Sequence, residues 1–171
     1  EVYIHAFTDG RDTDPKSGLH FIKELQQSMN TSVGKIASVS GRYYAMDRDK
    51  RWERVKLAYD ALVNGEGNKA TDAIAAIEQS YAANVTDEFI KPTVIINEAQ
   101  QPVATIKDGD AVICFNFRTD RCREITMALT QQEFPEQQMY PLNLYYTTMT
   151  EYDHTFKNIH VIFENDNLNN T

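Results

Sequence analysis

The feature that most constrains the fold is the alternation of short apolar segments with amphipathic ones. Segments rich in β-branched and aromatic residues, typical of strands, occur at 2–7, 35–40, 93–96, 111–115, 142–147 and 159–163. Between them lie segments with apolar residues at helical spacing: 15–29, 49–63, 69–83 and 119–129. Strands that alternate with helices predict a three-layer α/β fold, in which one mostly parallel or mixed sheet is flanked by helices. With 171 residues, 42% of them hydrophobic, the range 1–171 is expected to form a single domain.

Charge and composition argue against several classes of protein. The formal net charge is -8 and the pI is about 5.0, whereas binding to nucleic acid or to a membrane surface calls for a basic face. No apolar run is long enough to span a membrane, and no secretory leader pattern is present. The two cysteines, Cys114 and Cys122, lie outside any CxxC motif, so we expect free thiols and a cytoplasmic location.

The two ends of the chain suggest a part of a larger protein. Glu1 leads at once into an apolar segment, and the chain stops in the polar run Asn169-Asn170-Thr171. An intact protein rarely opens on a buried strand without a lead-in. We therefore expect further sequence on both sides.

Arginines follow directly on three of the expected strands. The chain holds eight arginines, and five of them stand in these positions: Arg11, Arg42, Arg48, Arg118 and Arg121. The carboxyl ends of parallel strands meet at one edge of a sheet, so the five side chains are expected to converge there. Guanidinium groups offer paired donors and keep their charge, which suits phosphate and carboxylate. The pattern predicts a site for a ligand with a phosphate and a carboxylate, or with several phosphates.

A second interpretation of the same residues is ordinary ion pairing at the surface. Acidic residues close enough in sequence to pair with the arginines are Asp9, Asp12, Asp47, Asp49 and Asp120. Five arginines at successive strand ends favour the anion site over this alternative. Asp12 has two readings of its own: a carboxylate among arginines stays ionised and could accept a proton from a bound hydroxyl, or it caps a turn.

The chain closely resembles the cofactor-independent phosphoglycerate mutases, the 2,3-bisphosphoglycerate-independent and metal-dependent type. Four segments carry the resemblance: HAFTDGRDTDP (5–15), SGRYYAMDRDKRWERV (40–55), NFRTDRCREI (116–125) and TMTEYD (148–153). The likeness runs over essentially all 171 residues. The last segment has no chemical role that we can assign, and a turn after a strand is the expected structure there.

The resemblance implies most of the substrate-binding domain inserted into a two-domain glycolytic isomerase. Such an enzyme interconverts 2-phosphoglycerate and 3-phosphoglycerate through a phosphoserine. The serine and two manganese ions belong to a phosphatase-like domain related to alkaline phosphatase, which has no counterpart here. We therefore expect the isolated chain to bind no manganese and to be inactive. Its expected partners are the two phosphoglycerates and the phosphatase-like domain.

The resemblance also implies roles for individual residues. Arg11, Asp12, Arg42 and Arg48 would contact the substrate, and Arg118 and Arg121 would close on the phosphate. Asp12 would be the catalytic residue that exchanges protons with the glycerate hydroxyls. The family's substrate-contacting histidine should precede Glu1, so His5 receives no role.

Two other functions stay open at this point. The first is a non-catalytic module that binds sugar phosphates or other anions, because its arginines would look the same. The second is nucleic-acid binding through the segment 42–44, Arg-Tyr-Tyr, against which the net charge speaks. We also expect an apolar edge that favours self-association of the chain.

Overall fold

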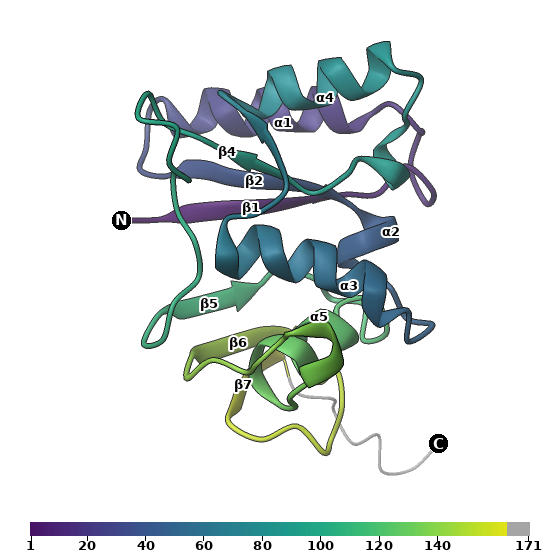
Figure 1. The fold of residues 1–171 in the computed structure, drawn as a ribbon, viewed down its shortest axis with the longest axis vertical. Coiled ribbons are helices and arrows are strands. Elements are labelled where there is room, and N and C mark those ends of the chain that lie inside the picture. The colour runs from purple at the N-terminus through teal and green to yellow at the C-terminus, as the bar shows by residue number, and fades with distance from the viewer. Residues whose placement is uncertain (164–171) are drawn as a thin grey trace.

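The computed structural model describes residues 1–163, whose strands form two sheets (Figure 1). The first sheet has the order β1-β2-β4-β3, with β1 at Tyr3–Thr8, β2 at Lys35–Gly41, β4 at Thr93–Ile95 and β3 at Asn68–Ala70. β1 is parallel to β2 and β3 to β4, whereas β2 and β4 are antiparallel. The second sheet is parallel throughout: β5 (Ala111–Cys114), β6 (Tyr145–Thr150) and β7 (Ile159–Phe163).

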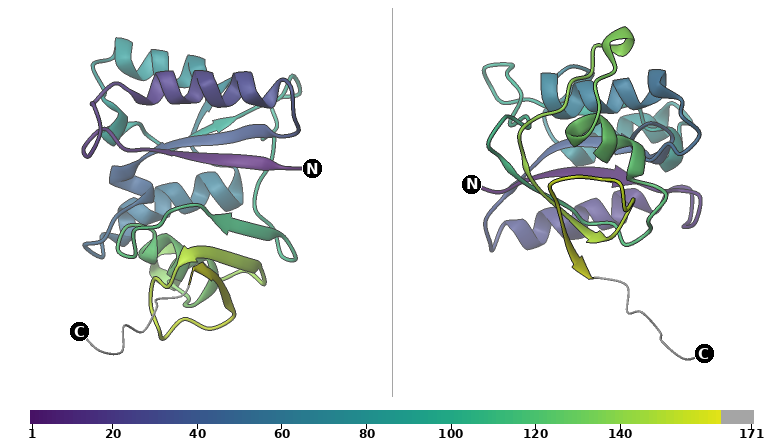
Figure 2. Two further views of the ribbon diagram at one scale, coloured as in Figure 1. Left: turned by 180° about the vertical axis from the view of Figure 1, so that it is seen from behind. Right: turned by 90° about the horizontal axis from the view of Figure 1, so that it is seen from below.

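Helices cover both faces of the first sheet, which confirms the predicted α/β class. α1 (Gly18–Met29) and α4 (Ala73–Ala82) lie on one face, as Figures 1 and 2 show. α2 (Arg42–Ala45), α3 (Trp52–Tyr59) and α5 (Arg123–Thr130) lie between the first sheet and the second. The expectation that all strands join a single sheet is therefore wrong, because a layer of helices separates the two sheets. None of the helices within residues 1–163 is long and apolar enough to cross a membrane.

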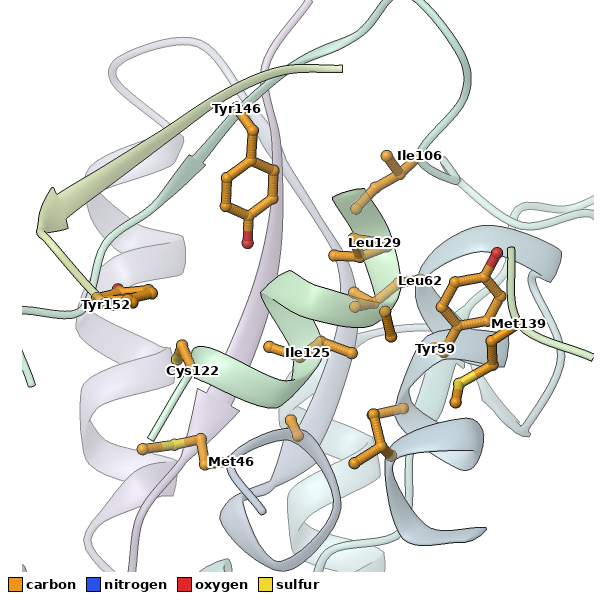
Figure 3. Close-up of a cluster of buried hydrophobic side chains, with 14 residues drawn as sticks. Met46, Tyr59, Leu62, Ile106, Cys122, Ile125, Leu129, Met139, Tyr146 and Tyr152 are labelled. Carbon is orange, nitrogen blue, oxygen red and sulfur yellow. The ribbon is translucent and has the colours of Figure 1, made fainter. Parts of the chain in front are cut away.

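Two apolar cores hold these layers together. One packs α1 and α4 on the first sheet through residues such as Ile22, Val39 and Ile77. The other fastens α5 between α3 and the second sheet. Figure 3 shows Ile125 and Leu129 of α5 beside Leu62. Since the loops that carry the candidate residues adjoin α3 and α5, this second core sets their positions.

Several elements differ from the predicted bounds. The helix expected at 69–83 begins only at Ala73, because 68–70 pair with β4 as a strand and the Asp72 side chain caps the helix by accepting a hydrogen bond from the Ala75 N–H (2.8 Å). The helix expected at 119–129 begins at Arg123. The strand expected at 142–147 is shifted to 145–150.

The helix expected at 49–63 shows how a local signal succeeds. It consists of α3 and a π-helical turn at Asp60–Asn64, and it ends where Gly65 adopts a left-handed conformation (φ 66°). Glycine reaches this conformation without a steric penalty, so the helix ends within one residue of the predicted bound at 63. Two short 3₁₀ turns, at Asp87–Phe89 and Pro135–Gln137, complete the described elements.

Candidate anion-binding site

Three strands end on the same side of the molecule. The arrows of β1, β2 and β5 point the same way in Figure 1, so the segments that follow them approach one another. An ion pair between Asp12, after β1, and Arg118, after β5, proves the approach. The segments converge as predicted, but the expected cause was wrong: β5 belongs to the second sheet, so the site lies between two sheets rather than along one edge. Not all of the five arginines take part.

Arg42 is buried at the bottom of this site. It is the first residue of α2, and its side chain is only 2% exposed. Its Nη1 donates hydrogen bonds to Asp9 and to Oδ2 of Asp12 (2.9 Å). Burial alone would lower the pKa of Arg42, but the two carboxylates outweigh it and raise the pKa. Its Nη2 is buried without an acceptor among the described residues, which marks a place for a further oxyanion.

Asp12 joins two arginines. Its Oδ2 also accepts a hydrogen bond from Arg118 Nη1 (2.5 Å). The hydrogen bond from Arg42 lowers the pKa of Asp12, so the carboxyl group is ionised at neutral pH, as the sequence predicts. The Asp12 side chain is half exposed, and Arg42 rather than Asp12 therefore forms the bottom of the site.

Asp120 extends the network to two further contacts. Its Oδ1 lies 3.4 Å from Arg118 Nε, and its Oδ2 accepts a hydrogen bond from Arg48 Nη1 at 2.7 Å. Burial by itself would raise the pKa of Asp120, but the hydrogen bond from Arg48 and the charge of Arg118 lower it. The network thus continues from Arg118 to the segment that follows α2.

Arg121 lies in strongly positive surroundings. The pKa of its guanidinium group is lowered, first by burial and then by the charges of Arg42 and Arg48. Its Nη1 makes only a long contact with the Met46 carbonyl oxygen (3.5 Å), and its Nε has no acceptor within residues 1–163. An anion would relieve this unfavourable environment. We call Arg42, Arg48, Arg118 and Arg121 the arginine cluster.

Arg11 does not join the arginine cluster. Its exposed side chain points to Glu88, with 3.3 Å between Nη1 and Oε1. Its backbone N–H donates to Asp9, so the turn itself borders the site. Four of the five arginines expected to converge therefore lie together in this structure.

The ion pairs of the alternative interpretation are present as well, but they are linked. Asp9, Asp12 and Asp120 contact the arginine cluster, while Asp47 pairs with Arg54 outside it (3.4 Å). Four guanidinium groups thus face three carboxylates, which leaves one positive charge in excess. A connected network with a positive excess and unused buried donors is suited to an anion.

A 3₁₀ turn that sequence reasoning missed holds the loops after β1 and β2. The Thr8 hydroxyl donates to the Asp87 carbonyl (2.8 Å), and the Gly41 N–H donates to the Ile90 carbonyl (2.8 Å). A Cβ on Gly41 would lie 2.4 Å from the Glu88 carbonyl oxygen, so only glycine allows this approach. Nothing in the local pattern links position 87 to positions 8 and 41.

The segment 148–153 supports the loop that carries Arg118. The Thr150 hydroxyl donates to the Phe117 carbonyl (2.8 Å), and the buried Tyr152 hydroxyl donates to the Asn116 carbonyl (2.5 Å). The expectation of a turn after a strand is wrong for the first half of this segment, because 148–150 belong to β6 and only 151–153 follow the strand. The contacts of the segment with the loop explain a motif to which the sequence assigned no role.

The segment 42–44 is not free to stack on and bind a nucleic acid. Arg42 is buried, and the Tyr43 ring lies 3.9 Å from the Arg54 guanidinium carbon.

No metal-binding group is found among residues 1–163. No three histidine, cysteine, aspartate or glutamate side chains there are grouped so that they could hold a metal ion. Both cysteines are free thiols.

Comparison with known proteins identifies the family. The model of the N-terminal region of the 2,3-bisphosphoglycerate-independent phosphoglycerate mutases, described as "BPG-independent PGAM N-terminus", matches residues 1–154. The chain belongs to this family. Its members do not depend on 2,3-bisphosphoglycerate as a cofactor.

Relatives within the family agree over the whole chain. The chain is 58% identical over 171 residues to the 2,3-bisphosphoglycerate-independent phosphoglycerate mutase of Flavobacterium johnsoniae, 57% to that of Parabacteroides distasonis and 54% to that of Clostridium acetobutylicum. These matches cover 100% of the chain but 34% of each relative, so the chain spans about a third of the length of the curated relatives it matches.

A solved phosphoglycerate mutase of Leishmania mexicana, determined at low cobalt concentration, shares the fold. The TM-score is 0.79 at 34% sequence identity, over 89% of this chain and 30% of that one. The relatives carry the names of mutases, so the alternative of a non-catalytic anion-binding module gains no support from them.

Proposed function

We propose that this chain is the phosphoglycerate-binding domain of a 2,3-bisphosphoglycerate-independent phosphoglycerate mutase, an isomerase that interconverts 2-phosphoglycerate and 3-phosphoglycerate. The observation that carries the proposal is the arginine cluster, with its positive excess and its unused buried donors on Arg42 and Arg121. Residues 1–171 form one domain of that enzyme, and a phosphatase-like domain outside this sequence completes it. We also propose a cytoplasmic location, in keeping with the two free thiols.

Different arginines bind different parts of the substrate. Arg118 and Arg121, from the segment after β5, hold the phosphate, while Arg42 and Arg48 hold the glycerate with Arg11 at the rim. Paired guanidinium donors orient a small dianion more strictly than point charges do. Held in this way, the glycerate can turn without leaving when its phosphoryl group has been transferred.

The phosphoryl group passes to a serine of the phosphatase-like domain and returns to the other hydroxyl. In the first step the bond from phosphorus to the glycerate oxygen breaks, and that oxygen takes up a proton. In the second step the other hydroxyl loses its proton as it bonds to phosphorus. Two manganese ions, which we assign to the phosphatase-like domain, supply positive charge to the phosphoryl group when bound.

Asp12 in its protonated form gives the glycerate oxygen its proton in the first step, while the serine loses its own proton as it bonds to phosphorus. In the second step Asp12 takes a proton back from the other hydroxyl, and the serine oxygen regains one. In the free chain its carboxylate pairs with Arg42 and Arg118. Substrate anions that take over these guanidinium donors remove the charges that keep the Asp12 pKa low. Substrate binding therefore raises the pKa of Asp12, so that the carboxyl group can take up the proton that the first step requires and accept one again in the second.

A pair of exchanges between arginine and lysine tests the proposal. Arg118→Lys keeps the charge but removes the paired donors, and a lost charged hydrogen bond is worth roughly 1.5–3 kcal/mol, or about tenfold or more in affinity. Lys107→Arg, at an exposed position outside the site, is the matched control. We expect weak binding of 3-phosphoglycerate to the 171-residue chain by NMR titration, further weakened only by Arg118→Lys.

The same two variants in the full-length enzyme test the reaction. Arg118→Lys should lower kcat/KM by a similar or larger factor, and Lys107→Arg should leave it unchanged. Equal effects of both variants, or shifts in the NMR titration that lie away from the arginine cluster, would contradict the proposal.

A further inference from the structure

Two buried carboxyl groups stand on the segments that carry Arg48 and Arg121. Asp47 lies between α2 and α3, and Glu124 lies in the first turn of α5. They are only 5% and 6% exposed. Burying a carboxyl group costs free energy unless each of its oxygens has a hydrogen-bond partner.

Asp47 is fixed by three donors. Its Oδ1 accepts hydrogen bonds from the N–H groups of Asp49 (2.9 Å) and Arg51 (3.0 Å). Its Oδ2 lies 3.4 Å from Nη1 of Arg54. These contacts give both oxygens of the Asp47 carboxyl group a partner and shape the turn that carries Arg48.

Glu124 has only half of its contacts. Its Oε1 accepts a hydrogen bond from the Lys50 N–H (2.8 Å), but its Oε2 is buried and has no donor within residues 1–163. The N–H groups of Asp49 and Arg51, on either side of Lys50, bind Asp47, so the two carboxyl groups meet at the same turn. Two carboxylates cannot bond to each other unless one of them is protonated, so a proton on Glu124 is what gives Oε2 a partner.

The electrostatic environment agrees with this geometry. Burial raises the pKa of Glu124 to about 7, opposed by the Lys50 N–H and supported by Asp47 and Asp49. The charged groups that face the pair are therefore Asp49, from the turn after α2, and Arg54, from α3, which contacts Asp47.

We propose that Asp47 and Glu124 share one proton and act as positioning residues that hold Arg48 and Arg121 in the arginine cluster. Arg48 is the neighbour of Asp47, and Arg121 stands three residues before Glu124 and reaches the Met46 carbonyl. The shared proton joins the two segments that bear these arginines. Loss of the proton leaves two buried negative charges side by side, which drives the segments apart.

The variant Glu124→Gln imitates the protonated state. Its amide N–H can donate permanently to Asp47, and its carbonyl oxygen can still accept from the Lys50 N–H. Glu133→Gln makes the same chemical change at an exposed position and is the matched control. Carbon-13 NMR of the carboxyl groups and nitrogen-15 NMR of the arginine side chains follow the titration in the 171-residue chain.

The NMR measurement does not depend on any ligand. We expect the Glu124 carboxyl to titrate near pH 7 in the unmodified chain and in Glu133→Gln, with Arg48 and Arg121 resonances shifting at the same midpoint. In Glu124→Gln these arginine shifts should vanish. A Glu124 carboxyl that titrates at its ordinary value, or arginine resonances that do not follow it, would overturn the inference.

Binding of 3-phosphoglycerate gives the second readout, which rests on the proposed function. From below to above pH 7 the dissociation constant of the unmodified chain and of Glu133→Gln should rise about fivefold or more, and that of Glu124→Gln should not. Ionisation of the phosphate itself affects all three proteins alike, as does the Cys114 thiol, whose pKa is also about 7. Identical pH profiles for all three would overturn the inference, whereas absence of binding at every pH would overturn the proposed function and leave the NMR result to decide this one.

Discussion

At the scale of single residues, burial decides the protonation of His5. The ring lies in β1 with Nδ1 2.8 Å from the Ser38 hydroxyl of β2, and burial lowers its pKa to about 4. In the unfolded chain a histidine has its ordinary pKa of about 6.5. Below that pH His5 is protonated in the unfolded chain but stays neutral in the folded chain. His5 therefore lowers the stability of the fold as pH falls from about 6.5 through about 4.

Between pH 7 and pH 4.5 this difference in pKa should lower the free energy of unfolding by about 2–3 kcal/mol. Glu124 acts in the opposite direction, since its raised pKa costs stability as pH rises from about 4.5 to 7. We expect His5→Gln to lose less stability than the unmodified chain between pH 7 and pH 4.5, measured as urea unfolding free energies. His160→Gln, at an exposed position, should follow the unmodified chain. Parallel pH slopes for all three would show that His5 accepts a proton while folded.

At the scale of elements, the 3₁₀ turn at Asp87–Phe89 acts as a clamp. The Asp87 carboxylate accepts hydrogen bonds from the Gly18 N–H (2.7 Å) and from the Tyr81 hydroxyl (2.5 Å). The backbone N–H of Asp87 donates to the Pro15 carbonyl. One residue thus ties the start of α1, the end of α4 and the loop that bears Asp12.

From these contacts of Asp87 we expect two variants to lose different amounts of stability. Asp87→Ala leaves the buried Gly18 N–H and the partly buried Tyr81 hydroxyl without an acceptor. Each lost acceptor costs about 1–3 kcal/mol, so a loss of roughly 2–6 kcal/mol is expected. Tyr81→Phe removes the hydroxyl that donates to Asp87 and accepts a long contact from the Leu19 N–H (3.3 Å), but it leaves the Gly18 contact in place, so it should cost less, about 1 kcal/mol. Urea unfolding at constant pH measures both. Equal losses would mean that the Gly18 contact contributes nothing.

At the scale of the whole molecule, one face of the second sheet is apolar and exposed. Phe115 is 84% exposed, and Ile113 and Tyr145 are exposed beside it on β5 and β6. An exposed patch of this kind favours association with another surface. The tendency to self-associate, which was expected from an apolar edge, stays a prediction, and we now place it at this exposed face instead.

Sedimentation velocity over a range of concentrations checks this tendency. Phe115→Ser should shift the chain toward monomer, because it removes the most exposed large apolar side chain from the patch. Val33→Ser, at an exposed position in another part of the fold, should leave the distribution unchanged. A strictly monomeric unmodified chain at all concentrations would refute the prediction.

The whole chain by itself should also lack mutase activity. The proposed chemistry takes its serine and its metal ions from the phosphatase-like domain, and arginines alone supply no nucleophile. We expect no interconversion of the two phosphoglycerates by purified chain, with the full-length enzyme as positive control. Activity that survives removal of host enzyme would contradict this assignment.

Local patterns in the sequence determined the α/β class, the end of the helix near position 63 and the placement of arginines after strands. Each depends on residues within one turn or one strand, so spacing alone reveals it. The motifs at 5–15, 40–55 and 116–125 also determined the family.

Only the tertiary structure decided how these parts meet. The division into two sheets, the start of α1 at Gly18 and the pairing of Arg11 with Glu88 depend on residues far apart in the chain. The same holds for the buried pair of Asp47 and Glu124, whose sequence neighbours show nothing unusual. The physical reason is that burial and long-range packing determine which donors and acceptors remain without water, and periodicity along the chain contains no record of either.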